Sequence, residues 1–443
     1  MIEQLWLQPP LAFARLGPSR TPCDNHSWGP SDLTPRGTGK TTVVPQPTLD
    51  LAANGTLSQR TPEHVRFKDA QGWRPICPYF EVHGSWTVDG ERHDGPVTED
   101  VLREFGLSLA DVTWTVAVAN LKAHHLTQSE GDRIEARVEV RGDDHQRHRL
   151  DGTSPQDAPE PLVPAGRSVP LGSVQLPAPN PRLPELRLRF TPAAGFVYGP
   201  SDLPSDGNYQ VPQERRFLNP DARWSDWQLT GEDPRTVPGG LFAGAERGRS
   251  VGLVDDVCDG LVTVSLRGGP SATGRVVACP PVFSPDRRPF VSIADGLTDR
   301  VRRGDVRRPE YLADTELTAR ETRDLFERIL ETMGNVNLDV MNGIFEALPR
   351  AVPLTGVLLG LTEQGRRRHR RFVALEMLED LLRERPDLIR AVVRQPGADP
   401  SFNALMPVDM RGADGAALHL TRRQYDLLEG WARSLRESTE AGT

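Results

Sequence analysis

The sequence predicts an α+β protein: a β-rich, sandwich-like body with long loops, followed by a C-terminal helical region. Gly and Pro number 40 each among 443 residues, which favours frequent turns over a helical solenoid or coiled coil. Apolar and polar residues alternate in several segments up to about residue 300, and helical spacing of apolar residues follows. A chain of this length usually forms two or three domains.

Residues 1–150 are predicted to be a β-rich N-terminal region that begins with an extended coil. Residues 1–60 are rich in Pro, Gly, Ser and Thr and show little periodicity, so we expect them to wrap the core as coil. Strand patterns follow at 112–121 and at 134–140. In the second of these, one face carries Ile134, Ala136, Val138 and Val140.

A proline-rich loop is predicted for residues 151–190, which show no periodic pattern. Residues 191–305 are predicted to form a second β-rich region. Strand patterns resume just before it with ELRLRF at 185–190 and continue within it as SVGLVDD, GLVTVSL and GRVVACPPVF.

Residues 306–443 are predicted to be helical. Thr318 with Glu321 forms a capping-box pattern, as does Thr421 with Gln424. A second amphipathic helix is expected to stop at Pro386, and a short third helix is expected at 387–394. The apolar stripes of the first and last helices contain Leu325, Phe326, Ile329, Leu330 and Met333, and Tyr425, Leu427, Leu428, Trp431 and Leu435.

Composition excludes several classes of protein. The net charge of -8 gives no general reason to bind nucleic acid, and no apolar run is long enough to span a bilayer. The N-terminus lacks a basic region, so we expect no signal peptide and a cytoplasmic protein with four reduced cysteines. Three lysines stand against fifty arginines, which indicates a GC-rich coding bias.

Two short motifs match catalytic patterns, but the segments around them lack the strand and helix that those patterns require. The segment around Lys40 resembles a phosphate-binding loop, but Thr34 replaces its first Gly and prolines flank it. GRSVG, centred on Ser250, matches a nucleophile elbow, but turn and strand patterns follow it where a helix is required. We therefore expect a Gly-rich turn at Lys40 and no hydrolase site at Ser250.

Metal and nucleic-acid sites are also not expected. The cysteines form no C-x-x-C pair and no His lies at ligand spacing from them. Asp255, Asp256 and Asp259 could bind Ca²⁺, but a turn in which Asp side chains cap backbone N–H groups is commoner. The basic runs at 300–308 and 366–371 lack interleaved aromatic residues and are interpreted as solvated helix segments.

Several stretches, in order, resemble the LodA-like family. The segments are LAFARLGPS, VTWTVAVANLKA, GLVDDVCDGLVTVSL, VVACPPVFSPD, LFERILETMGNVN and MPVDMRGADGAALHLTRRQYDLLEGWA. That family comprises the amino-acid oxidases dependent on cysteine tryptophylquinone, such as the lysine epsilon-oxidase and glycine oxidase types. The resemblance implies their fold and, in a complete member, oxidative deamination of an amine.

The resemblance also implies that the cross-linked Cys and Trp follow the last matching segment. Here no Cys follows Cys279, and RSLRESTEAGT is a polar tail. We therefore expect no quinone cofactor and a non-catalytic binding or assembly protein, or one part of a split enzyme. The alternative is an active quinoprotein oxidase whose quinone uses Cys258 or Cys279 with Trp224 or Trp227; unrelated chemistry on the same scaffold also stays open.

The candidate ligand-binding residues are Trp114, Asn120, Lys122 and Arg411. Trp114 and Asn120 are six apart on one predicted strand and therefore share a face, which Lys122 is expected to continue. Arg411, on a predicted loop, could bind a carboxylate through two hydrogen bonds. The ligand expected from the resemblance is an amino acid or amine, and a partner protein or a second copy stays open. The alternative is that these residues have structural roles only: Trp114 packs in the core, Asn120 hydrogen-bonds the backbone at the end of the strand, and Lys122 is solvated.

Overall fold

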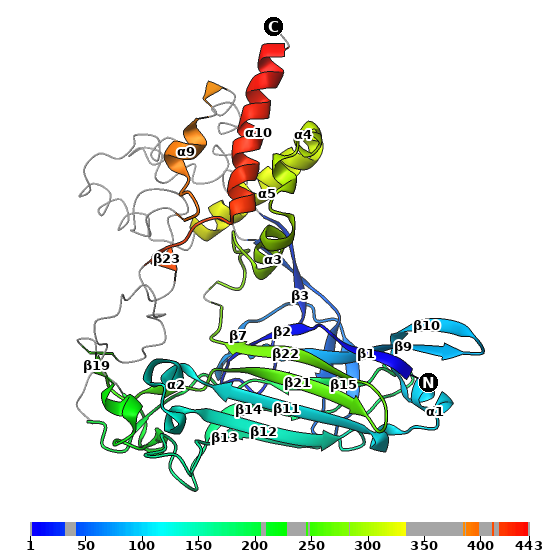
Figure 1. The fold of residues 1–443 in the computed structure, drawn as a ribbon, viewed down its shortest axis with the longest axis vertical. Coiled ribbons are helices and arrows are strands. Elements are labelled where there is room, and N and C mark those ends of the chain that lie inside the picture. The colour runs from blue at the N-terminus through cyan, green and yellow to red at the C-terminus, as the bar shows by residue number, and fades with distance from the viewer. Residues whose placement is uncertain are drawn as a thin grey trace. The chain divides into compact units, whose positions relative to one another are not determined.

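The computed structural model describes residues 2–31, 41–204, 210–227, 245–246, 249–282, 284–333, 384–385, 387–397, 410–411 and 416–441 (Figure 1). The chain forms two compact units. The first comprises Met1–His26, Pro45–Val237 and Leu241–Phe283, and the second comprises Ser27–Val44, Pro238–Gly240 and Ser284–Thr443. The predicted α+β class is confirmed, with a β-rich body and helices near the C-terminus.

The first unit is built on two large sheets. The six-stranded sheet has the order β1-β9-β15-β14-β13, with β10 paired to β9, and the five-stranded sheet has the order β12-β11-β21-β22-β2. Neighbours are antiparallel except β2 and β22, which are parallel. The strands are β1 Ile2–Gln8, β2 Leu11–Arg15, β9 Tyr79–Val88, β10 Glu91–Pro96, β11 Val112–Asn120, β12 Ile134–Arg141, β13 Arg147–Gly152, β14 Val169–Gln175, β15 Arg187–Thr191, β21 Cys258–Leu266 and β22 Ser271–Cys279.

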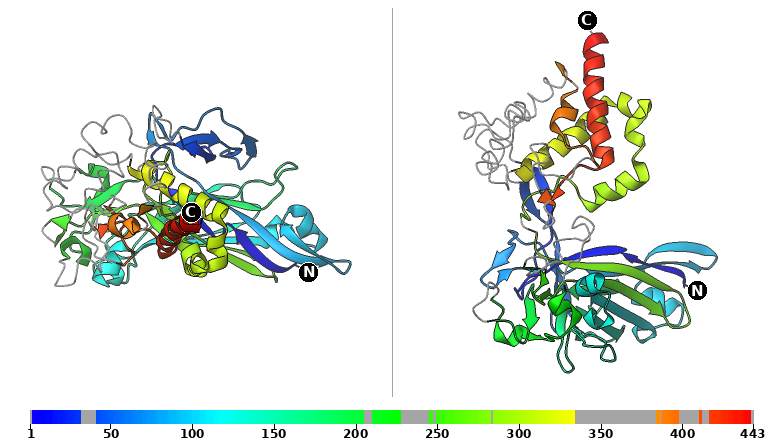
Figure 2. Two further views of the ribbon diagram at one scale, coloured as in Figure 1. Left: turned by 90° about the horizontal axis from the view of Figure 1, so that it is seen from above. Right: turned by 60° about the vertical axis from the view of Figure 1, so that its left-hand side comes forward.

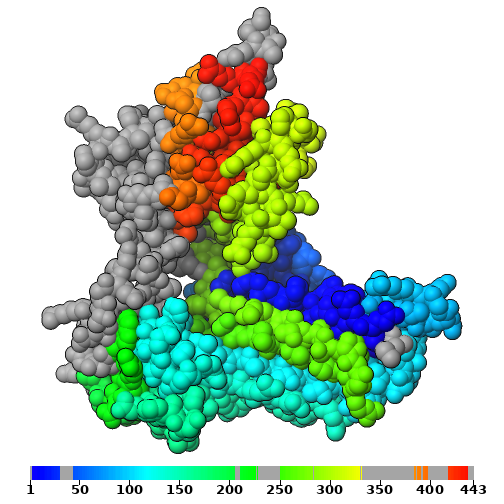
Figure 3. Space-filling view, in the orientation of Figure 1, coloured from blue at the N-terminus to red at the C-terminus, as the bar shows by residue number. Residues whose placement is uncertain are grey.

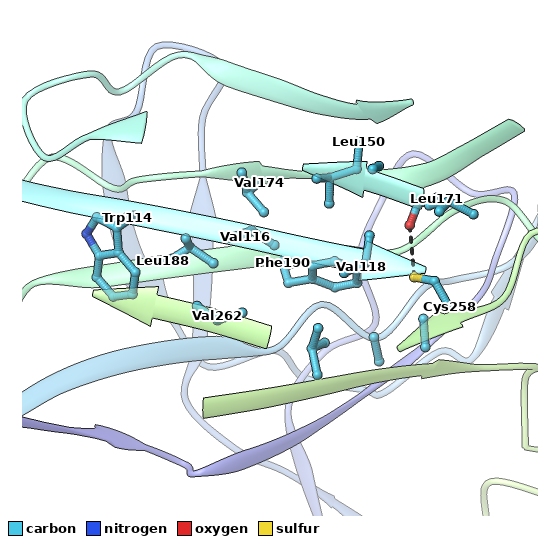
Figure 4. Packing of buried hydrophobic residues seen from close by; sticks show 14 of the residues in the cluster. Trp114, Val116, Val118, Leu150, Leu171, Val174, Leu188, Phe190, Cys258 and Val262 are labelled. Atoms are coloured by element: carbon cyan, nitrogen blue, oxygen red, sulfur yellow. Dashed lines mark hydrogen bonds between the residues drawn. The ribbon is translucent and has the colours of Figure 1, made fainter. Parts of the chain in front are cut away.

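The inward faces of both sheets share one hydrophobic core (Figure 4). Strand β11 alternates strictly, and Trp114, Val116 and Val118 point to this core. The other sheet contributes Leu188 and Phe190. The two sheets also approach each other at their edges, where β1 lies beside β22 and β12 lies beside β13. The body is therefore a β-sandwich, in which paired inner faces are removed from water.

The space-filling view shows β1 and β2, in blue, against β22, in green, on one face of this sandwich (Figure 3). This corrects the expectation of an N-terminal coil, because β1 and β2 place one strand in each sheet. Leu5, Leu7, Ala12 and Ala14 are buried and lie two apart within each strand. The two strands are too short for their alternation to stand out among the neighbouring Pro and Gly residues.

The proline-rich segment 151–190 is more ordered than a loop. Strand β14 lies within it and pairs with β13 and β15. Pro170 is accommodated because β15 pairs only with Ser173–Gln175, and because a register irregularity interrupts the β13 pairing beside it. A proline lacks an N–H for the ladder and therefore fits a strand where pairing is interrupted.

Smaller elements surround the sandwich. A three-stranded sheet joins β16 (Val197–Pro200) to β17 (Arg216–Leu218) and β20 (Val254–Asp255). The other small elements of this unit are β5 Thr48–Leu51, β6 Leu57–Arg60, β7 Lys68–Asp69, β8 Gly72–Trp73, α1 Glu99–Glu104, α2 Lys122–Thr127, β18 Ala245–Glu246 and β19 Arg249–Ser250. The paired strands β3 His26–Ser31 and β4 Thr41–Pro45 fall mainly in the second unit.

Helices dominate the described part of the second unit (Figure 2). They are α3 Ile293–Arg302, α4 Pro309–Ala313, α5 Thr315–Met333, α9 Leu388–Val392 and α10 Arg422–Ala441, with the short strands β23 Met410–Arg411 and β24 Ala416–Ala417. Helix α10 contacts each of the other four helices. Its predicted stripe is confirmed, because Tyr425, Leu428 and Trp431 are buried.

The two predicted capping boxes have different outcomes. Thr421 and Gln424 form theirs, since the Thr421 hydroxyl accepts from the Gln424 N–H at 3.2 Å and the Gln424 side chain accepts from the Thr421 N–H at 2.9 Å. The box at Thr318 is wrong, because α5 begins one turn earlier and the Asp314 side chain accepts from Leu317 N–H. Thr318 instead donates to the Asp314 carbonyl inside the helix.

Candidate functional site

The predicted polar residues meet where strand β11 ends. Asn120 closes β11, and its amide donates to the backbone carbonyl of Asp255 at 2.8 Å. The Lys122 ammonium lies 2.5 Å from the Asp255 carboxylate, and both side chains are partly buried. The structure therefore brings Asn120 and Lys122 together on Asp255, a residue 133 positions after Lys122.

The local backbone explains this geometry. The Asn120 side-chain oxygen accepts a hydrogen bond from the Lys122 N–H at 3.2 Å, and α2 begins at Lys122. This local bond favours a bend in place of a continued strand. Lys122 therefore does not continue the β11 face, which corrects that part of the prediction.

Trp114 is part of the core. Its exposed fraction is 2%, and the cavity beside it has a volume of about 10 Å³. That space is no larger than a water molecule requires. Trp114 and Asn120 do share a face, as predicted, but six residues of strand separate them by roughly 20 Å. A ligand at Lys122 would not contact Trp114.

Arg411 lies in β23, in the second unit, and its side chain falls outside the described residues. The same is true of the Lys40 segment and of the basic run at 366–371. The other basic run is partly neutralised, because Arg303 pairs with Asp299 and Arg307 pairs with Asp426.

Asp256 is a further candidate for a functional residue. The sequence predicted only that it lies in a turn. Its exposed fraction is 1%, and one carboxylate oxygen accepts from the backbone N–H groups of Gly195 and Phe196 at 3.0 and 2.9 Å. Burial raises the pKa of Asp256 to about 6, and the charge of Asp255 acts in the same direction. The other oxygen, Oδ1, is buried and has no hydrogen-bond partner among the residues that the structure describes. Asp256 thus binds backbone N–H groups, but in a segment about 60 residues away and not within the local turn that the sequence predicted.

A hollow of about 460 Å³ lies beside Phe196, whose backbone N–H donates to Asp256. Phe196 and Tyr198 line it from β16 and the residues before it, and Arg167 and Arg215 line it from two other segments. The sequence offered no signal for this site, because its residues come from three separated stretches that lack a motif. We refer to this hollow as the arginine pocket.

Other candidate chemistry is not supported in the described ranges. Ser250 lies in β19 and the strand β20 follows, with the Ser250 hydroxyl accepting from Gly252 N–H at 3.1 Å. No group of three or more His, Cys, Asp and Glu side chains among the described residues could hold a metal ion. Nor does any described helix have the length and apolar character needed to cross a membrane.

The Cys and Trp side chains from which the alternative hypothesis would build a quinone lie in the first unit. The Cys258 thiol donates to the Leu171 carbonyl at 3.3 Å (Figure 4), and burial raises the pKa of this thiol far above its ordinary value. The Trp224 indole N–H donates to the Leu253 carbonyl at 2.9 Å, and its ring stacks on Trp227 with centroids 6.4 Å apart. All four cysteines are free thiols.

No family model matches the chain, and no curated protein matches it. Solved structures of the L-Lys epsilon-oxidase from Marinomonas mediterranea are similar to it. One of them has a TM-score of 0.48 and 16% identity, and the structure of the Schiff base intermediate with L-Lys has a TM-score of 0.45 and 15% identity. Each match covers 97% of this chain and 61% of the other chain. The present chain thus spans less than two thirds of the length of these structures.

Proposed function

We propose that these 443 residues form a LodA-like scaffold that binds a small ligand or partner without catalysing amine oxidation, either alone or as one part of a split enzyme. It would act in the cytoplasm, without a quinone cofactor. The resemblance in sequence motivates the family, and the placement of the Cys and Trp side chains supports the absence of catalysis.

The burial of Trp224 and Cys258 carries this proposal. An amine oxidised by a quinone forms a covalent bond to it, so the ring must be open to substrate. Trp224 has an exposed fraction of 1%, and Cys258 is also buried. Each bonds to a backbone carbonyl of the core, as a packing residue does.

The ion pair at Lys122 supports the same conclusion. The Lys122 ammonium lies 2.5 Å from the Asp255 carboxylate, so this lysine makes a structural contact inside the first unit. Asn120 and Lys122 could still recognise the charged groups of an amino acid or amine. Arg411, in the second unit, is a separate candidate for binding a carboxylate, and both roles remain part of the proposal.

The test combines intact mass, absorption and peroxide release for the purified chain. We expect the mass calculated from the sequence, no visible absorption band, and no peroxide from a panel of amines and amino acids. A peptide with a Cys–Trp cross-link and added oxygen, together with peroxide release, would establish the alternative oxidase. Replacing the Cys and the Trp found in that peptide (Cys258→Ala or Cys279→Ala, and Trp224→Phe or Trp227→Phe) would then abolish both signals. The matched variants Trp73→Phe and Cys23→Ala would retain them.

A further inference from the structure

The arginine pocket has the size and lining of a small-molecule site. Its volume of about 460 Å³ falls within the range of pockets that hold small organic ligands. The residues that matter for recognition are Arg167, Ser168, Phe196, Tyr198, Arg215 and Phe217.

Both arginines are held by aromatic rings. The Arg215 guanidinium lies 4.3 Å from the centre of the Phe196 ring, and the Arg167 guanidinium lies 5.2 Å from that of Phe217. Stacking occupies the face of a guanidinium and leaves its N–H edge available. In the described part of the chain neither arginine has a carboxylate partner, whereas Arg187, on β15, pairs with both Glu81 and Glu185.

The aromatic side chains form a wall that is only partly covered. Tyr198 and Phe217 are buried and meet edge to face, with centroids 5.7 Å apart. Phe196 has an exposed fraction of 40%. This exposed ring lies beside two guanidinium groups that have no carboxylate partner among the described residues, so the pocket offers both an apolar surface and an anion site.

Hydrogen bonds and strand pairing hold the Phe196 side of this pocket in place. Asp256 binds the backbone N–H groups of Gly195 and Phe196, and Tyr198 pairs with Val254 between β16 and β20. Phe196 is therefore positioned before any ligand arrives, which reduces the entropy lost on binding.

The net charge of the residues that line the pocket favours a singly charged anion over a doubly charged one. Glu214 also lines the pocket, so two arginines face one carboxylate and one positive charge is in excess. A monoanion neutralises this excess, whereas a dianion such as a phosphate monoester exceeds it. Two N–H groups of a guanidinium match the two oxygens of a carboxylate.

We infer that the arginine pocket binds a small aromatic carboxylate, whose carboxylate is held by Arg167 and Arg215 and whose ring covers Phe196. Lys122 does not line this site, and the site requires no quinone. It adds a ligand class to the proposed binding function, and the peroxide assay tests that function separately.

Calorimetric titration of the full chain with benzoate tests the inference, with acetate, benzamide and phenyl phosphate as comparisons. We expect benzoate to bind most tightly. Loss of a charge-assisted hydrogen bond weakens binding by about tenfold or more, so Arg167→Gln and Arg215→Gln should each have this effect. Arg215→Lys should recover binding only in part, and Phe196→Ala should weaken benzoate but not acetate.

Arg92→Gln, at an exposed arginine on β10, is the matched control and should leave benzoate binding unchanged. Circular dichroism checks that each variant is folded. Benzoate binding that survives both arginine changes, or no binding by the wild type at millimolar concentration, would overturn the site. If benzamide bound as tightly as benzoate, the role of charge would be overturned, and if acetate did so, the role of the ring would be overturned. Tighter binding of phenyl phosphate than of benzoate would overturn the choice of a carboxylate.

Discussion

The Lys122 ammonium lies 2.5 Å from the Asp255 carboxylate and so ties the start of α2 to the end of β20. Asn120 reinforces the same connection through the Asp255 carbonyl. Two of the residues selected from the sequence as ligand-binding candidates thus make contacts inside the first unit. Their first measurable effect should be on stability.

Lys122→Met should lower the free energy of unfolding by about 1 kcal/mol, as expected for a partly buried ion pair. Asp255→Asn and the double variant complete a double-mutant cycle in urea, and we expect a positive coupling energy between the two positions. If Lys122 served only a ligand, the variant would keep its stability, the coupling would vanish and only ligand binding would be lost.

Asp256 should make stability depend on pH. Burial raises the pKa of Asp256 in the folded chain from 3.8 to about 6, so between these values the unfolded state binds fewer protons than the folded state. Stability must then fall as the pH rises through this window, by up to about 3 kcal/mol.

Asp256→Asn removes this titration. The difference in unfolding free energy between variant and wild type should therefore shift in favour of the variant from pH 4 to pH 7. Chemical denaturation at several pH values measures the shift. Parallel curves for the two proteins would show that the carboxyl group titrates normally.

Gly260 should not tolerate a side chain. It pairs with Val118 across β21 and β11, and a Cβ atom at this position would lie 2.0 Å from the Ala117 carbonyl oxygen. Gly260→Ala should therefore cost about 3 kcal/mol or more, because the neighbouring backbone must move.

Gly296→Ala provides the matched control. Gly296 lies in α3 and its Cβ would meet no atom within 4 Å, so alanine should stabilise the helix by up to about 1 kcal/mol. In thermal denaturation, the melting temperature should fall for Gly260→Ala and rise for Gly296→Ala. A stable Gly260→Ala protein would contradict the observed strand pairing.

Trp431 should act as a core residue of the second unit. Its exposed fraction is 3%, and it lies on the buried face of α10 with Leu427 and Leu428. Trp431→Ala should cost about 3–5 kcal/mol in chemical denaturation, because it leaves a cavity. Trp28→Ala, at a half-exposed ring, should cost much less, and a loss below about 1 kcal/mol for Trp431 would contradict the packing.

Local patterns were sufficient for much of the fold. The alternation of Ile134, Ala136 and Val140 predicted β12, and Thr421 with Gln424 predicted the start of α10. Each pattern depends on neighbours within a few residues, which the sequence displays directly. The strand at Pro170 and the helix start at Asp314 were missed, because pairing partners and competing caps decide them.

The sequence by itself determined the α+β class and the shared face of Trp114 and Asn120. Tertiary structure alone decided that Lys122 pairs with Asp255 and that Arg167 and Arg215 face one hollow. These contacts join segments that lie far apart along the chain. Their formation depends on strand order and register, which follow from burying one common core and not from any local spacing of residues.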